Sequence, residues 1–141
     1  MAFIVELGAA ALVGALLEVQ IEGENGWAEN LPTWEVKTPS WARPLLGARS
    51  ITGYHVFVQL FMLVILHAPY ALGFVAPSLS AELRILSFLV LFWVVEDFLW
   101  FVVNPEFGIR RFRRGEIWWH AATWWGFMPR DYWIGLPLGI G

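Results

Sequence analysis

The stretch SAELRILSFLVLFWVVEDFLWFVV, residues 80–103, decides the class of fold because it is apolar almost from end to end. It is longer than the roughly 20 residues that a helix needs to cross the hydrocarbon core of a bilayer. Ser78 and Ser80 are candidate N-cap residues for this helix. Asn104-Pro105 should end it, because the residue before a proline avoids the helical conformation. The stretch therefore predicts a transmembrane helix.

Two further apolar stretches precede it, at about residues 2–20 and about 52–75. Pro69 lies inside the second of these and should kink that helix. Hydrophobic residues make up 58% of the chain and charged residues 15%, against roughly a quarter charged in an ordinary soluble domain. We therefore expect an all-α integral membrane protein, with three transmembrane helices in a small bundle.

The remaining segments are polar or rich in Pro, Gly and Trp. Residues 21–50 should form a loop on the membrane surface, held there by its three Trp side chains. Residues 104–141 should form an aromatic C-terminal segment that lies in the membrane interface or folds back onto the bundle. The whole chain is expected to be a single membrane domain.

Basic residues predict the orientation. Eight of the nine Lys and Arg residues lie in the loop 21–50 or after residue 103, and only Arg84 lies between the second and third helices. Cytoplasmic segments carry the excess of basic residues. We therefore expect a multi-pass protein of the cell (inner) membrane, with its N-terminus outside and its C-terminus in the cytoplasm.

Glu96 and Asp97 are the most informative residues, because each carboxylate near the bilayer centre costs about 2.5–3.5 kcal/mol. Such residues normally face a bundle interior or a wet cavity and have a partner there. At about 1.5 Å of rise per residue, other polar residues fall in the same inner-leaflet layer. These are Glu18, His55, Gln59 and Asn104.

One interpretation of this layer is a metal site. Carboxylates and imidazoles that project inward from several helices bind iron, manganese or zinc in helical bundles. The candidate ligands are Glu18, His55, Glu96, Asp97 and His120, with Glu96 and Asp97 also the candidate catalytic residues. Two alternatives remain open: a hydrogen-bonded polar cluster that fixes helix register, and a relay for protons or a substrate.

The candidate residues for binding a substrate or a lipid lie around this layer and in the tail. Glu96, Trp100 and Asn104 share one helix face, since they are spaced four residues apart. Four arginines just inside a helix end are typical of membrane anchoring, and they could also bind an anionic head group. The full set is Gln59, Trp100, Asn104, Arg110, Arg111, Arg113 and Arg114.

The function that these features favour is a metal-dependent enzyme acting on a hydrophobic or lipid-like small molecule. Whether the chain is an enzyme is not fixed by any motif. The alternatives are an accessory subunit of a larger membrane complex and a small homo-oligomeric transporter. Nucleic acid is not an expected partner, because the basic residues lie against the lipid bilayer. The chain has no Cys, which excludes disulfides and thiolate chemistry.

Overall fold

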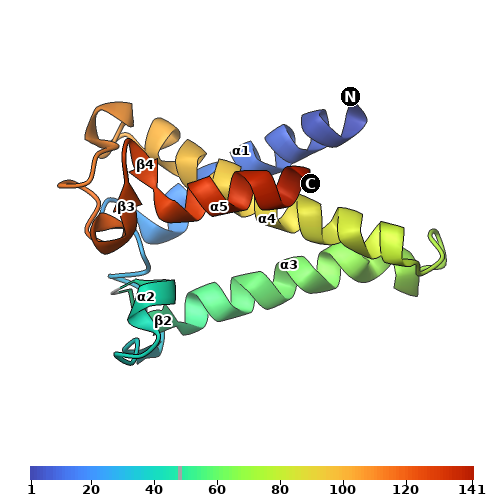
Figure 1. The fold of residues 1–141 in the computed structure, drawn as a ribbon, viewed down its shortest axis with the longest axis horizontal. Helices are drawn as coiled ribbons and strands as arrows, with labels where there is room; N and C mark the ends of the chain where they lie inside the picture. Colours follow the sequence, from blue (N-terminus) through green and yellow to red (C-terminus); the bar gives the residue numbers. More distant parts are fainter. Residues whose placement is uncertain (48) are drawn as a thin grey trace.

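The computed structural model describes residues 1–47 and 49–141 (Figure 1). Its three long helices are α1 (Ala2–Glu22), α3 (Gly53–Ala71) and α4 (Leu79–Val103). Each is long and apolar enough to cross a membrane. The prediction of three such segments is therefore confirmed, with boundaries close to those expected.

The connections contain short elements that the sequence did not reveal. Two antiparallel pairs of two-residue strands form, in which Glu35 is opposite Thr52 and Trp124 is opposite Pro129. The short elements are β1 (Glu35–Val36), α2 (Arg43–Leu46), β2 (Ile51–Thr52), the 3-10 helices η1 (Ile109–Arg111) and η2 (Ala121–Thr123), β3 (Trp124–Trp125) and β4 (Met128–Pro129). The protein is thus mostly helical, with a little sheet that pins the loop before α3 and the loop before the last helix.

Helix α1 packs closely against α4 along a row of small side chains. Ala11 and Ala15 are fully buried, and a Cβ atom at Gly14 would lie 3.0 Å from the ring of Phe92. Small residues of this kind let two helix backbones approach each other. Gly8, which has the same spacing, is exposed with open space around it. Gly8 itself lies off the contact, which continues before it through Leu7, buried with Leu91 and Phe92, and the ring contact of Phe3 with Phe88.

The C-terminal helix α5 (Arg130–Ile140) folds back and runs antiparallel to α4 (Figure 1). Its Gly135 and Gly139 are buried, and a Cβ atom on either would lie within 2.6 Å of Val94 or Leu91 of α4. This is the close approach that a Gly-xxx-Gly spacing permits. Of the two arrangements expected for the tail, its last part adopts the one that returns to the bundle.

Helix α3 lies apart from the other helices. It joins α4 through the turn 72–78, and the two helices separate toward the start of α3 (Figure 1). Gly53 is the one residue of α3 that is buried among those described. The helix ends two residues after Pro69, so this proline belongs to its last turn. Ser78 caps α4 by accepting a hydrogen bond from the Ala81 amide at 3.2 Å, as predicted.

Candidate functional site

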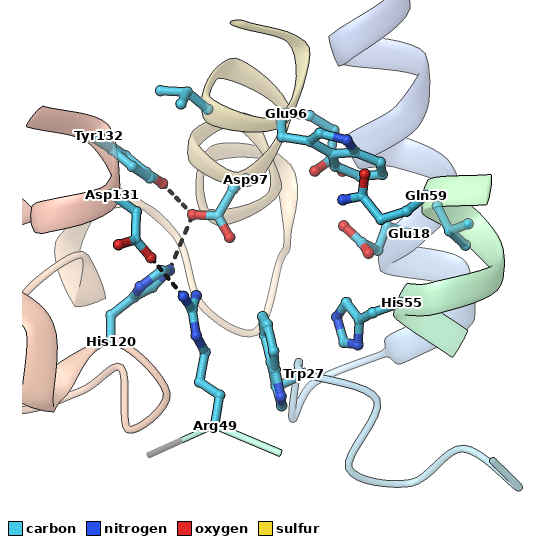
Figure 2. Close-up of a pocket in the computed structure, with 13 residues that line it drawn as sticks. Glu18, Trp27, Arg49, His55, Gln59, Glu96, Asp97, His120, Asp131 and Tyr132 are labelled. Atoms are coloured by element: carbon cyan, nitrogen blue, oxygen red, sulfur yellow. Dashed lines mark hydrogen bonds and ion pairs between the residues drawn. The ribbon is translucent and has the colours of Figure 1, made fainter. Parts of the chain in front are cut away.

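A cavity of about 280 Å³ opens where α3 and α4 have separated (Figure 2). Four helices and the loop before α3 contribute to it. Its lining combines charged, polar and aromatic side chains: Glu18, Trp27, Arg49, His55, Val58, Gln59, Trp93, Val94, Glu96, Asp97, His120, Asp131 and Tyr132. We call this cavity the chamber.

A group of possible metal ligands lies at one wall of the chamber, where Glu18 and His55 line the cavity and Glu22 lies beside them. Single ligand atoms of Glu18, Glu22 and His55 all lie within 4.8 Å of one another. Glu22 is buried, and its Oε1 lies 3.8 Å from Nε2 of His55. Two carboxylates and an imidazole are a ligand set that suits iron, manganese or zinc. We call Glu18, Glu22, His55 and Glu96 together the acidic wall.

Glu96 joins this wall from α4. It is 3% exposed, and its carboxyl group lies near the Glu18 carboxyl, with which it lines the same cavity. The Tyr54 hydroxyl donates a hydrogen bond to Glu18 at 3.2 Å. Two carboxyl groups this close together repel each other unless a proton or a cation lies between them. A proton or a cation in this wall would therefore relieve the repulsion between its carboxyl groups.

His55 is held in place from two sides. Its Nδ1 lies 2.6 Å from the Thr52 hydroxyl, and the Trp27 indole stacks on its ring with centroids 4.1 Å apart. A partner on one ring nitrogen fixes the orientation of a histidine and leaves the other nitrogen for a ligand. The Nε2 atom of His55 is therefore directed toward the carboxyl groups.

The turn that carries Trp27 is strained. Trp27 and Ala28 have φ angles of 48° and 53°, a conformation that costs most side chains energy. The Ala28 amide donates a hydrogen bond of 2.5 Å to Glu22 Oε1. A candidate ligand thus also holds the turn that places the indole against His55.

The opposite wall of the chamber is built around Asp97. Its carboxylate accepts hydrogen bonds from the Tyr132 hydroxyl and, at 3.3 Å, from His120 Nε2 (Figure 2). The His120 side chain is 3% exposed. We call these three residues the aspartate wall. In the aspartate wall, one carboxylate accepts hydrogen bonds from two segments, the loop that carries His120 and helix α5, which carries Tyr132.

An ion pair closes the chamber at its base. Arg49 Nη2 lies 2.6 Å from Asp131 Oδ2, and the Arg49 guanidinium sits over the Trp27 ring at 4.7 Å. Arg130 also binds Asp131, at 2.9 Å, and donates to the Pro44 carbonyl. These contacts tie the loop before α3 to the start of α5.

The structure places most of the predicted site residues together. Those that line the chamber are Glu18, His55, Gln59, Glu96, Asp97 and His120. Trp100 and Asn104 are buried on the same face of α4 as Glu96, as predicted, but they lie outside the chamber lining. Trp100 packs in an aromatic cluster with Trp119, and the Asn104 amide donates to the Gly23 carbonyl at 2.9 Å.

The four arginines of the tail lie on its exposed surface, away from the chamber. Arg111 and Arg113 bind the Glu116 carboxylate at 3.2 and 3.0 Å. Hydrogen bonds from Arg113, which has the larger effect, and from Arg111 lower the pKa of Glu116 below its ordinary value. Arg114 donates to the Ala121 carbonyl, and Arg110 is exposed. All four arginines are thus exposed and do not line the chamber.

Several residues of the site were missed from the sequence. Glu22 lies one helical turn after Glu18, and that spacing was the available signal. Tyr132 could not be found in this way, because its place depends on the return of α5 along α4. Arg49 and Asp131 lie 82 positions apart, and charge alone does not pair them.

In comparisons with known proteins, no protein-family model, curated protein or solved structure matches this chain. Functional inference therefore depends on the geometry of the chamber.

Proposed function

We propose that the chain is a membrane-embedded, metal-dependent enzyme that acts on a hydrophobic small molecule inside the chamber. The observation that supports this most is the cluster of ligand atoms from Glu18, Glu22 and His55 within 4.8 Å of one another, with the Glu96 carboxyl beside it. A single divalent ion of iron, manganese or zinc is the proposed cofactor.

Electrostatic attraction would favour a cation in the acidic wall. An unpaired carboxylate taken out of water costs several kcal/mol, and buried acids are normally paired or bind metals. Three carboxyl groups belong to the acidic wall, and His55 is its basic member, whereas Arg49, which also lines the chamber, is paired with Asp131. A divalent ion bound by Glu18, Glu22 and His55 would balance this negative charge, with the Glu96 carboxyl nearby.

The same proposal places the chamber relative to the membrane. α1, α3 and α4 would cross the cell (inner) membrane, with the basic loop 21–50 and the tail on the cytoplasmic side. The chamber lies at the end of α1 and the beginning of α3, so it would face the cytoplasmic leaflet. A hydrophobic substrate would then reach it from the bilayer.

The two walls would have different roles: the acidic wall would bind the metal, and the aspartate wall would accept a proton. A bound metal of this kind activates water or dioxygen. Asp97 would accept a proton from the reacting group, since its carboxylate lines the same chamber. Tyr132 and His120 orient that carboxylate through their hydrogen bonds.

A proton relay is a second candidate function, favoured by the proximity of Glu18 and Glu96, which line the same cavity. Two carboxyl groups in contact can share one proton, and chains of intramembrane acids are typical of proton pathways. A relay would need further spans to enclose its path. The exposed face of α3 would then pack against a second copy of the chain or another subunit of a membrane complex.

Metal content decides between these functions. Purified protein is reconstituted separately with Fe²⁺, Mn²⁺ and Zn²⁺, passed through a desalting column and measured by elemental analysis. Wild type and Glu24→Gln, which removes an exposed acid close to the site, should retain stoichiometric metal, whereas Glu18→Gln should lose it. Wild type that retains none of the three metals would overturn the metal proposal and leave the relay.

A further inference from the structure

A second cavity, of about 150 Å³, adjoins the chamber between α1 and α3. The two cavities share four lining residues: Glu18, Val58, Trp93 and Glu96. Most of its other lining residues are apolar, and they include Leu17, Ile21, Phe61 and Met62. We call this second cavity the groove. A ligand could therefore place one end in the polar chamber and the other in the apolar groove.

The groove faces outward from the bundle. Leu17 is 59% exposed and Phe61 is 62% exposed, and they belong to two helices that are long and apolar enough to cross a membrane. In a bilayer such side chains would meet lipid tails rather than water. The groove would therefore give lateral access from the hydrocarbon region to the chamber.

The volume of the groove limits what it can hold. An apolar cavity of about 150 Å³ accepts a benzene-sized group, so the groove fits one hydrocarbon chain better than two. Burying each CH₂ group of such a chain contributes about 0.8 kcal/mol to transfer from water. The groove thus selects for a single-chain molecule over a diacyl lipid.

The chamber limits the other end of the molecule. Four of its lining residues are acids, and Arg49 is already bound to Asp131 and lies over Trp27. Trp93 lines both cavities, and its indole N–H is buried without a hydrogen-bond partner among the described residues. An anionic head group would be repelled, whereas an uncharged oxygen would give this N–H an acceptor.

From these observations we infer that the substrate is a single-chain amphiphile with an uncharged, oxygen-bearing head group, such as a long-chain alcohol. Its head would lie in the chamber beside the acidic wall, and its chain would lie in the groove between α1 and α3. This inference rests on the proposed enzymatic function and narrows the substrate to one chemical class.

A photoreactive long-chain alcohol, with a diazirine on its chain, tests the inference on metal-loaded protein in nanodiscs. Mass spectrometry should find saturable labelling at Met62 or Phe61, which unlabelled alcohol competes away. The same chain with a carboxylate head should compete poorly. Equal competition by the carboxylate would overturn the choice of head group.

Two variants test the position of the chain. Leu17→Trp should fill the groove and abolish the saturable labelling. Leu16→Trp is the matched control, since Leu16 is also exposed, at 47%, and lies outside the groove lining. Labelling that is unsaturable in wild type, or equal in the two variants, would overturn the inference.

Metal content measured on the same samples separates the two claims. Wild type that holds metal but shows no saturable labelling contradicts the proposed substrate class alone. Wild type that retains no metal contradicts the proposed function itself, whatever the labelling shows.

Discussion

The two walls of the chamber treat their carboxyl groups in opposite ways. Asp97 accepts hydrogen bonds from Tyr132 and His120, so the protein itself satisfies its charge. Glu96, the preceding residue, is 3% exposed and its carboxyl lies near that of Glu18. Consecutive residues of a helix point about 100° apart, and this rotation sends the two acids to different neighbours.

This difference separates a structural requirement from a binding one. An acid with hydrogen-bond donors supplied by other segments stabilises the fold and can act as an oriented base. Acids that face each other destabilise the fold unless a cation or a proton joins them. The acidic wall is therefore the part of the molecule where a bound ion would change the stability most.

The largest expected effect is the loss of metal affinity when the imidazole of the acidic wall is removed. His55→Asn should lower metal affinity by more than roughly 100-fold, since even outer-shell changes cost about 10–100-fold. His67→Asn is the control on the same helix, because His67 binds the Leu63 carbonyl and Glu82 away from the chamber. Metal titration by calorimetry measures both. Equal affinities in the two variants would remove His55 from the site.

Substituting the two adjacent acids compares the walls directly. Asp97→Asn should destabilise the metal-free protein by about 1.5–3 kcal/mol, the range for hydrogen bonds to a charged group. Glu96→Gln should leave its stability unchanged or raise it, because a repelling carboxyl is removed. Denaturant unfolding in detergent micelles gives both values. Equal losses would show that the two acids have equivalent surroundings.

Pushing α5 away from α4 should disrupt the aspartate wall alone. In Gly135→Val, the new Cβ atom would lie 2.6 Å from Cγ2 of Val94. Overpacking of this kind costs about 1–3 kcal/mol. Unfolding of this variant is compared with that of Ile134→Val, whose side chain is exposed. Metal affinity should be nearly unchanged in both. A large loss of metal from Gly135→Val would mean that the two walls are not separable.

The smallest effect concerns an acid outside the helices. Arg113 and Arg111 lower the pKa of Glu116 below its ordinary value of 4.5. Its contribution to stability is therefore present above the unfolded-state pKa and is lost as pH falls through the lower, folded-state value. Arg113→Gln should move the pKa of Glu116 upward in an NMR titration, and Arg110→Gln should not. An unchanged value in Arg113→Gln would contradict the ion pair.

The helices could be predicted well because long apolar runs and capping residues act locally. Ser78 and the Asn104-Pro105 pair mark the ends of α4 in the sequence as they do in the structure. The return of α5 was left open, since Pro137 and several glycines weaken its helical pattern. The close approach that Gly135 and Gly139 permit can be recognised only when α5 is seen packed against α4.

The candidate site was predicted in composition but not in arrangement. Depth along each helix predicted one layer for Glu18, His55, Glu96 and Asp97, and in the structure these four residues line one cavity. Depth does not fix rotation between helices, so the separation of Asp97 from the other acids was not predicted. The partners of Asp97 come from segments whose positions depend on tertiary packing.

Anomalous X-ray diffraction from crystals of the metal-reconstituted protein tests the central claim most directly. Data collected at the absorption edge of the bound metal should show one peak between the carboxyl groups of Glu18 and Glu22 and the Nε2 atom of His55. A peak against Asp97 and His120 instead, or no peak in the chamber, would contradict the proposal that the acidic wall is a metal centre.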